Sequence, residues 1–590
     1  MKLSRPVLAH EEIQATGGMA VAQHPLGARI GVEVLERGGN AIDAAVTTAF
    51  AMGVLQPYMN GLGGGGQMVI HLAEGDPAVV YYGMMAPALA RPDMYELEPG
   101  AAYAGEVSLQ YSRSFAWPKV RNEANTRGHS SIAVPGTAAG LCLALEKWGT
   151  MTLDQALTPA IRMAEEGFTV GHHFALASLA DRGTLLRHEG TAAVFCPGGN
   201  TVPNGGRLVQ KDHARTLKLV AKNGPDGFYK GETAQRISQD CASHGGTLRA
   251  GDLAAYKALV LKPVLAKYRG FELLAASGPT AGTTCVEILQ ILQYFDLAKL
   301  GWGSASALHF IIEATRLAAA DRFTYMGDCD GAPWAELAAA RYAESRAKKI
   351  AGPRAVDPVA GDPWETSGGK RPKEFPAPAG APADSGTTHI TVVDRKRNAV
   401  SLTQTNYGYS GVVHPGVGIM MNNGMGWFYP APGTVNSVAP GRRGLNNMTP
   451  IVLLKDGRLH AALGASGGRR IWTAVSQTIV NFVDFGMTLQ EAMQAPRLHV
   501  ETDDVLLDGR FGLDVRRALE RRGHVVEMAT PHFDRSPYAE PNGIWRDGRT
   551  LRSGVYPVAK PTYAAGYPGG ENALSGAEGV VLAPRPDLHP

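Results

Sequence analysis

The sequence is poor in cysteine, and the few cysteines are widely scattered. There are five in 590 residues, and none belongs to a CxxC pair. They stand at Cys142, Cys196, Cys241, Cys285 and Cys329. An odd number at wide spacing argues against a disulfide framework and against a zinc site. We therefore expect neither a fold that is cross-linked by disulfides nor a bound metal.

Long apolar runs and a dominant charge are also lacking. The first residues, MKLSRPVLAHE, have no apolar core of a signal peptide, and no later run is long enough to span a bilayer. The formal net charge is only +3, and the basic residues are scattered, with short pairs at 442–443 and 469–470. These features predict a cytoplasmic protein without membrane or nucleic-acid partners.

What the chain does have is length, glycine and proline. Its 590 residues, 44% hydrophobic and 19% charged, suffice for a large core or for two intertwined halves. Residues 351–386 hold seven prolines among small and polar residues, which predicts a flexible linker. Residues 563–590 are Gly/Pro-rich again and predict a loose tail.

Two helices are predicted near the N-terminus. Residues 25–37 have helical spacing and end at Gly38-Gly39. Asn40 is a suitable N-cap for a second helix running towards Leu55, with Asp43 in its first turn.

The tripeptide Gly386-Thr387-Thr388 follows the linker and opens a β-rich run. Cutting before Thr387 would give an N-terminal residue that carries both a hydroxyl nucleophile and an α-amine base. The reference pKa of an α-amine is about 7.7–8.0, so part of it is neutral at working pH. The alternative is a threonine that merely opens an ordinary strand.

The surrounding pattern favours the first interpretation. Residues 387–394 and 399–405 predict a hairpin, with Thr387 at its start and Thr405 at its end. Residues 451–455 and 458–463 predict a second hairpin with an Asp-Gly turn, which leads through Gly467-Gly468 into a helix at 472–483. Free backbone N–H groups at such a helix start suit an oxyanion hole. A Gly-rich turn without a ligand fits the same residues.

Several ordered blocks resemble the γ-glutamyltransferases (γ-glutamyltranspeptidases) over nearly the whole chain. They include HPLGARIGVEVLERGGNAIDAAV from His24, NGLGGGGQMVI, NGPDGFYKGETAQRIS, TTHITVVDRKRNAVSLTQT, NMTPIVLLKDG and GASGGRRI. The resemblance implies an α+β fold, the αββα four-layer sandwich of N-terminal-nucleophile hydrolases, formed jointly by two autoprocessed subunits.

The same resemblance implies roles for single residues. The chain would cut itself between Gly386 and Thr387 into a large subunit, 1–386, and a small subunit, 387–590. Thr387 would attack the substrate, Thr405 would hydrogen-bond the nucleophile or its amine, and the Gly467 and Gly468 N–H groups would hold the oxyanion. No cofactor is implied. Two such heterodimers could pair into a homodimer.

The departures from the family pattern fall where its members grip a γ-glutamyl group. The carboxylate-binding Arg position is Gly83, and the serine pair that assists it is Asn446-Asn447. The acidic amine-binding stretch is replaced by residues 422–428, NNGMGWF, which carry no charge. Charge-assisted hydrogen bonds contribute about 1.5–3 kcal/mol each, so losing several predicts a changed substrate. Candidate substrate-binding residues are Asn406, Gly424, Trp427, Asn446, Asn447 and Gly83.

Two further features bear on specificity. Trp427 and Met425, with Met84 and Met85, predict a larger apolar pocket, although ordinary core packing would explain them equally well. Residues 101–128 look inserted, and one of their basic residues could supply a carboxylate contact: Arg113, Lys119, Arg121 or Arg127. The segment between 428 and 442 is short, which would leave the site open to water.

The predicted function is therefore that of an autoprocessing Thr-nucleophile amidohydrolase or acyltransferase. It would act through an acyl-enzyme on a small-molecule amide that is not a simple γ-glutamyl compound. A genuine γ-glutamyltransferase or glutathione hydrolase is one alternative. An oxamate-type amidohydrolase or a biosynthetic C–C bond hydrolase is a second, and a non-catalytic binding protein on the same scaffold is a third.

Overall fold

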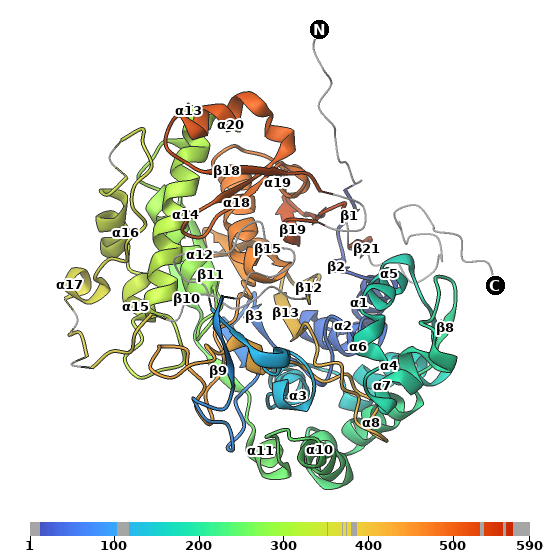
Figure 1. The fold of residues 1–590 in the computed structure, drawn as a ribbon. Coiled ribbons are helices and arrows are strands. Elements are labelled where there is room, and N and C mark those ends of the chain that lie inside the picture. Colours follow the sequence, from blue (N-terminus) through green and yellow to red (C-terminus); the bar gives the residue numbers. More distant parts are fainter. Residues whose placement is uncertain are drawn as a thin grey trace.

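The computed structural model describes residues 12–102, 117–350, 352–368, 370–372, 374–378, 386–531, 536–558 and 562–569. Two seven-stranded sheets lie face to face in its centre, and helices cover the outer face of each (Figure 1). This arrangement confirms the predicted α+β class and the four layers. Among the described helices, none combines the length and hydrophobicity that crossing a bilayer requires.

The first sheet contains the predicted nucleophile strand near its middle. Its order is β21 (Tyr563–Tyr567), β2 (Gly18–Ala22), β12 (Gly386–Val393), β13 (Ala399–Tyr407), β3 (Gly65–His71), β4 (Ala78–Tyr82) and β9 (Leu259–Leu261). Each of these pairs is antiparallel. β12 therefore lies between a strand from the N-terminal half of the chain and its own hairpin partner.

The second sheet carries the predicted oxyanion turn at the end of β15. Its order is β1 (Gln14–Ala15), β20 (Thr550–Val555), β19 (Glu540–Asp547), β15 (Arg458–Ser466), β14 (Ile451–Lys455), β11 (Phe271–Ala275) and β10 (Val264–Tyr268). The β14–β15 hairpin turns at Asp456 and Gly457, both with positive φ, as the Asp-Gly signal predicts.

The outer layers are helical. Against the first sheet lie α1 (Pro25–Glu36), α2 (Ala41–Leu55) and α3 (Thr137–Trp148), and against the second lie α12 (Gly282–Leu292), α18 (Ile471–Val483) and α19 (Leu489–Gln494), with α14 (Ala305–Tyr325) packed on α12. The shorter sheets are β5 (Leu97–Ala102) with β6 (Pro118–Val120), β7 (Phe168–Thr169) with β8 (Arg207–Leu208), and β16 (Leu498–His499) with β17 (Val505–Asp508) and β18 (Val526–Ala529). The remaining helices are α4 (Leu153–Glu166), α5 (His172–Ala180), α6 (Arg182–Leu185), α7 (Glu189–Phe195), α8 (Lys211–Asn223), α9 (Asp226–Tyr229), α10 (Gly231–Ser243), α11 (Ala250–Ala255), α13 (Leu297–Leu300), α15 (Trp334–Leu337), α16 (Ala340–Ala347), α17 (Pro363–Ser367) and α20 (Leu513–Glu520).

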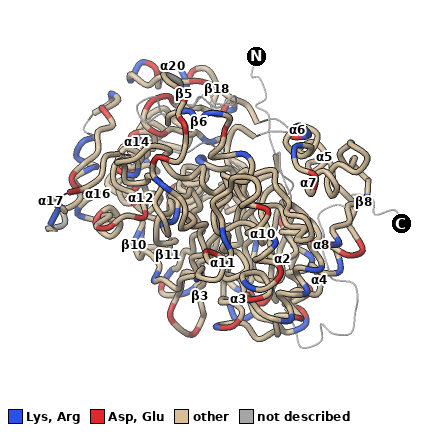
Figure 2. The backbone as a smooth tube through the Cα atoms, turned by 60° about the horizontal axis from the view of Figure 1, so that its bottom comes forward, with Lys and Arg blue, Asp and Glu red and all other residues tan. Residues whose placement is uncertain are grey.

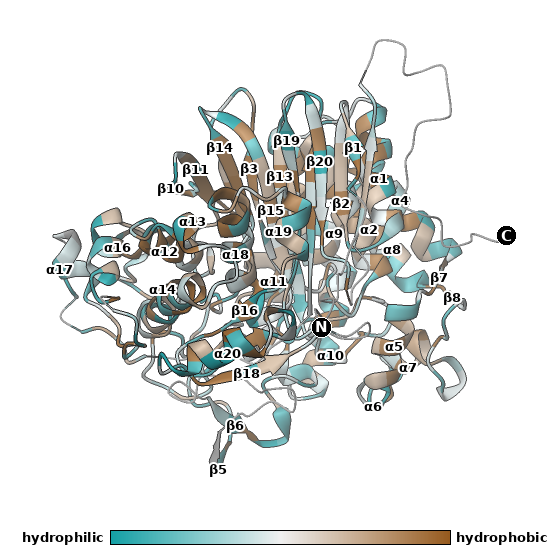
Figure 3. Cartoon of the chain, turned by 90° about the horizontal axis from the view of Figure 1, so that it is seen from above, coloured by the Kyte–Doolittle hydropathy of each residue, from teal (hydrophilic) through white to brown (hydrophobic). Residues whose placement is uncertain are grey.

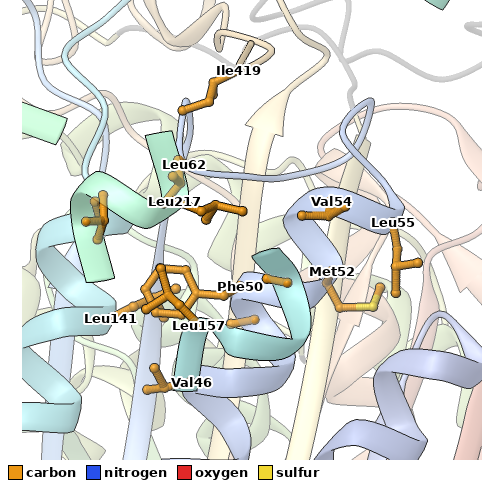
Figure 4. Packing of buried hydrophobic residues seen from close by; sticks show 14 of the residues in the cluster. Val46, Phe50, Met52, Val54, Leu55, Leu62, Leu141, Leu157, Leu217 and Ile419 are labelled. Carbon is orange, nitrogen blue, oxygen red and sulfur yellow. The ribbon is translucent and has the colours of Figure 1, made fainter. Parts of the chain in front are cut away.

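The predicted helix pair at the N-terminus is confirmed, and its second member lies deep in the core. The Asn40 side chain accepts from the N–H groups of Ile42 and Asp43, and Asp43 returns the bond to the Asn40 N–H, which makes a capping box. Every residue of α2 is buried. Phe50 of α2 lies beside Leu141 of α3 and Leu157 of α4 (Figure 4).

Strand alternation separates two kinds of packing. In β12, Ile390 and Val392 pack towards the helices, whereas Val393 belongs to an apolar layer between the sheets. Hydrophobic stretches run along strands such as β3 and β11 (Figure 3). Towards the start of β12, the layer between the sheets becomes polar. Basic and acidic residues are interspersed around the described chain (Figure 2).

The linker and the tail are more ordered than predicted. Within 351–386, α17 forms, Gly361 N–H donates to Asp321, and Ala377 exchanges backbone hydrogen bonds with Gly433 and Val435. The expected loose tail begins as strand β21, which pairs with β2. Both corrections have the same cause. Groups that are distant in the sequence form hydrogen bonds with the backbone of these segments, and composition alone cannot predict such partners. Residues 379–385 and 570–590 lie outside the described ranges.

Candidate active site

Thr387 lies on an irregularity at the start of β12. Gly386 is paired with Tyr407 and Thr388 with Gln404, so the register shifts across Thr387. Such a bulge redirects a side chain and breaks the ladder locally. Thr387 is 3% exposed and has the same strand parity as His389 and Thr391, which face the second sheet.

The Thr405 hydroxyl contacts the carbonyl of the predicted cleavage site. It accepts from the Tyr407 N–H at 2.7 Å and donates to the Gly386 carbonyl oxygen at 2.5 Å. Because the Tyr407 N–H can only donate, the Thr405 proton is left to the Gly386 oxygen. We expected Thr405 to contact the nucleophile or its amine. In the uncut chain it instead polarises the carbonyl that the nucleophile would attack.

Gln23, which the sequence did not single out, connects the two sheets beside this point. Its Oε1 accepts from the His389 N–H at 3.3 Å, and its Nε2 donates to Ser466 Oγ at 2.6 Å and to Glu540 Oε2 at 3.2 Å. Ser466 is the last residue of β15 and directly precedes Gly467. One buried amide thus sets the position of the nucleophile strand relative to the predicted oxyanion turn. Its only sequence signal is a polar residue at the end of an apolar strand.

Gly467 and Gly468 form the turn between β15 and α18. Their φ angles are 130° and 57°, and an added Cβ on Gly467 would lie 2.6 Å from Ala539 Cα. Glycine is therefore required at 467 for both conformation and space. Among the described residues, no backbone carbonyl accepts from either N–H group. The turn is consistent with an oxyanion hole, and that role stays a prediction.

His389 is a structural residue and not a base. Its Nδ1 is 2.7 Å from Thr403 Oγ1, and its Nε2 is 3.1 Å from Thr391 Oγ1. Burial lowers the pKa of His389 to about 3, so the ring is neutral at physiological pH. Both ring nitrogens are engaged by threonine hydroxyls between the sheets.

This burial predicts that acid destabilises the fold. Between about pH 6.5 and 3 the unfolded state binds a proton at His389 that the folded state does not, so the stabilisation is complete above pH 6.5 and is lost as the pH falls towards 3. One such group gives a slope of at most about 1.4 kcal/mol per pH unit. Urea unfolding of uncut chains at pH 7 and 4.5 should show a smaller slope in His389→Gln. Equal slopes would contradict this assignment.

Gly83 occupies a crowded place beside two tyrosines. An added Cβ there would lie 2.5 Å from the Tyr81 hydroxyl, and the Gly83 carbonyl accepts from the Tyr256 hydroxyl at 2.8 Å. The half-buried Arg443 guanidinium lies over both rings, at 5.7 Å from Tyr81 and 5.6 Å from Tyr256. A cation, Arg443, therefore lies near Gly83, the position at which the family has its carboxylate-binding arginine. It comes from a different segment of the chain.

The uncharged stretch at 422–428 is filled by packing. An added Cβ would lie 2.9 Å from Met84 Sδ at Gly424, and 2.7 Å from Tyr407 Cε1 at Gly426. Trp427 is 3% exposed, and its ring lies 5.3 Å from that of Tyr407. Met84 and Met425 belong to the same buried cluster. The uncut chain therefore has core packing at these residues, which is one of the two interpretations that the sequence left open.

Two of the three candidate asparagines, Asn406 and Asn446, hold backbone groups with their side chains. Asn406 donates from its side chain to Pro57 O at 2.8 Å and from its N–H to Met59 O at 2.9 Å, and Met59 Sδ lies next to Gly386. Asn446 bonds Pro279 O and the Met448 N–H. Their contact with substrate stays a prediction.

Arg322 is a second residue that sequence reasoning missed. It donates to Asn447 Oδ1 at 3.0 Å and to Asn446 O at 2.7 Å, and burial lowers its pKa to about 9. Its sequence signal is a charge inside the largely apolar helix α14. From helix α14, Arg322 thus holds the Asn446-Asn447 segment in place through these two hydrogen bonds.

The described basic residues of the predicted insertion are already paired with acids. Lys119 Nζ lies 3.1 Å from Glu98, and Arg121 Nη1 lies 2.7 Å from Glu96. Arg127 Nη1 lies 3.4 Å from Asp181. Because these three basic side chains are already paired, they argue against the expectation that this segment binds a carboxylate of the substrate. Arg113 lies outside the described residues.

Comparison with known proteins gives one consistent result. The sequence profile described as gamma-glutamyltranspeptidase matches residues 27–566. The chain is 38% identical over 514 residues to the acylase ACY 1 proenzyme of Pseudomonas sp. (strain SE83), covering 86% of this chain and 87% of that protein. It is 35% identical over 537 residues to the glutathione hydrolase proenzyme of Escherichia coli (strain K12), covering 88% and 87%.

Solved structures agree. The fold matches the crystal structure of cephalosporin acylase from Bacillus halodurans with a TM-score of 0.81 at 27% identity, covering 95% of this chain and 98% of that one. Helicobacter pylori gamma-glutamyltranspeptidase matches with a TM-score of 0.52 at 32% identity, covering 60% of this chain and 95% of that one.

Proposed function

Because the chain belongs to the gamma-glutamyltranspeptidase family, we propose that it is a self-processing amidohydrolase or acyltransferase with Thr387 as its nucleophile. The observation that carries this proposal is the hydrogen bond from Thr405 to the Gly386 carbonyl, beside the bulge at Thr387. This bond places a hydroxyl donor on the carbonyl that a Thr387 nucleophile would attack.

The processing step follows from these contacts. The Thr387 hydroxyl adds to the Gly386 carbonyl carbon, and Thr405 donates to the developing oxyanion. The C–N bond then breaks, its nitrogen takes the hydroxyl proton, and an ester joins Gly386 to Thr387 Oγ1. Water hydrolyses this ester to a Gly386 carboxylate and a Thr387 with a free hydroxyl and a free α-amine.

Turnover of substrate uses the same groups again. The α-amine of Thr387 takes the hydroxyl proton as the oxygen attacks the substrate amide, and the Gly467 and Gly468 N–H groups bind the oxyanion of the tetrahedral intermediate. The amine then gives the proton to the leaving nitrogen, and water or an acceptor amine releases the acyl group from Thr387. Nucleophile, base and oxyanion donors all come from the chain. The subunits 1–386 and 387–590 stay together, because β12 of one pairs with β2 of the other in the same sheet.

We further propose that the acyl group is not an ordinary γ-glutamyl group. Family members bind the carboxylate and the amine of the γ-glutamyl group at three places. In this chain none of these three places offers a free charged group to that substrate. Tyr81 crowds Gly83, Tyr407 crowds Gly426, and Asn446 is committed to the backbone. The Pseudomonas relative is named an acylase, which fits an acyl group of another kind.

A series of p-nitroanilides with acyl chains of equal length tests this specificity. The γ-glutamyl compound carries both charges, the glutaryl compound lacks the amine, and the pentanoyl compound lacks both. For the fully processed enzyme we expect kcat/KM for glutaryl or pentanoyl to exceed that for γ-glutamyl by at least about tenfold, since each lost charge-assisted bond corresponds to about 1.5–3 kcal/mol. Cephalosporin amides extend the series.

A genuine glutathione hydrolase is the second candidate, favoured by Arg443 near Gly83 and by the E. coli relative. If the protein is a glutathione hydrolase, the γ-glutamyl compound should react fastest in this series. The substitution Arg443→Met should then raise the KM for the γ-glutamyl compound. That result would overturn the proposed change of substrate but not the nucleophile. A chain that stays uncut and inactive towards every amide would instead indicate a binding protein.

A further inference from the structure

Three ionisable side chains from distant parts of the sequence meet on the surface of the large subunit. His129 lies in the short turn His129–Ser131, and Asp240 and His244 stand one turn apart at the C-terminal end of α10. Their ligand atoms all lie within 4.8 Å of one another. None of them belongs to the candidate active site.

The distances within this group suit one small cation. His129 Nε2 is 3.0 Å from Asp240 Oδ2, and His244 Nδ1 is 3.2 Å from Asp240 Oδ1. Around a tetrahedral ion with bonds of about 2.0–2.1 Å, neighbouring ligand atoms lie about 3.3 Å apart. The rings of His129 and His244 lie nearly parallel with their centroids 4.4 Å apart, so one ring must turn before both can direct a nitrogen at the same ion.

The contacts of Asp240 also suit a metal. His129 and His414 both lie within hydrogen-bond distance of its Oδ2, and His244 faces its Oδ1.

A third histidine contacts Asp240 from the buried side of the group. His414 is fully buried, and its Nδ1 lies 2.6 Å from Asp240 Oδ2, while its Nε2 lies 3.8 Å from the Cys241 thiol. Carboxylates that bind a metal are themselves held by hydrogen bonds, and His414 supplies such a bond to Asp240. The His244 side chain is 54% exposed, which leaves a path for an ion from solvent.

We propose that His129, Asp240 and His244 bind a divalent first-row transition-metal ion such as Zn²⁺, with His414 orienting Asp240. Two imidazoles and one carboxylate leave coordination positions for water. On binding, His129 shifts its proton from Nε2 to Nδ1 through solvent, so that Nε2 becomes a ligand.

The site joins parts of the two subunits. His129 and α10 belong to residues 1–386, whereas His414 lies in the segment after β13. That segment folds back through backbone bonds between Val412 and Met421 and leads directly into Asn422. A bound ion would therefore hold the segment before Gly424 against α10, at a distance from the chemistry at Thr387.

Metal titration of the processed, EDTA-dialysed protein tests the proposal. Co²⁺ is followed by its visible d–d absorption, and Zn²⁺ by competition with Co²⁺ and by calorimetry. We expect one ion per pair of large and small subunits. The affinity for Zn²⁺ should be at least tenfold lower in His244→Ala and in Asp240→Asn. His172→Ala, which changes another exposed histidine, should bind as the unaltered protein does.

Two results would overturn the proposal. One is the absence of saturable binding of either ion. The other is unchanged affinity in His244→Ala, which is expected to fold normally because its side chain is mostly exposed. The buried group His309, Glu313 and His524 is the alternative location. Loss of binding in His524→Gln but not in His244→Ala would place the ion there instead.

Discussion

Replacing Thr387 by alanine is expected to leave a single chain of 62.5 kDa without amidase activity. The unaltered chain should give fragments of about two thirds and one third of that mass, because cleavage before residue 387 divides it so. Without the hydroxyl there is no nucleophile for the Gly386 carbonyl and no acyl-enzyme for any substrate. A denaturing gel and a p-nitroanilide assay measure both losses.

The adjacent threonine provides a matched control. Thr388 is fully buried, and its hydroxyl has no hydrogen-bond partner among the described residues. Thr388→Val keeps the shape and removes only that hydroxyl, so cleavage and activity should persist. Thr387→Ser should still be cut, since it retains a hydroxyl. Cleavage of Thr387→Ala at the same bond would refute Thr387 as the processing nucleophile.

The second large effect is expected at Thr405. Thr405→Val keeps the volume but removes the hydrogen bond to the Gly386 oxygen. Loss of one preorganised oxyanion donor slows acyl transfer by about 10²–10³-fold. We therefore expect processing to slow by a factor in that range, measured as the disappearance of the uncut chain with time.

Two comparisons separate this role from general damage. Thr405→Ser restores the donor and should recover most of the processing rate. Thr405→Val should still unfold in urea in one transition, as Thr387→Ala does, but at a lower midpoint, because the buried Tyr407 N–H loses its acceptor. A Thr405→Val chain that matures at the normal rate would show that the hydrogen bond to Gly386 has no catalytic role.

The sequence located the elements of the fold well where the signal was local. The Asn40 cap, the Asp-Gly turn and the alternation in 387–405 each depend on neighbours in sequence, and the structure has all three. The predicted hairpin alone brings Thr405 to the start of β12, where it contacts the Gly386 carbonyl. The family resemblance added the sandwich of two sheets, and the role that it gives Gly467 stays a prediction.

What the sequence could not supply were contacts made across the fold. Gln23 reaches Ser466 and Glu540 from the other end of the chain, and no spacing rule connects them. The same holds for His129 and Asp240, which are 111 residues apart. Trp427 was ambiguous because an aromatic residue suits a pocket or a core, and only its neighbours in space decide which.

The anchoring of Ala377 has a consequence for the enzyme after cleavage. The new chain end at Gly386 is only nine residues beyond a point fixed by two backbone hydrogen bonds to the 433–435 segment. Its carboxylate can thus move no further than about 30 Å from that anchor. A group tethered so closely is present at an effective concentration of the order of millimolar, however dilute the enzyme. If the chain cleaves itself before Thr387 as we propose, substrates would enter a site that keeps this carboxylate within that distance.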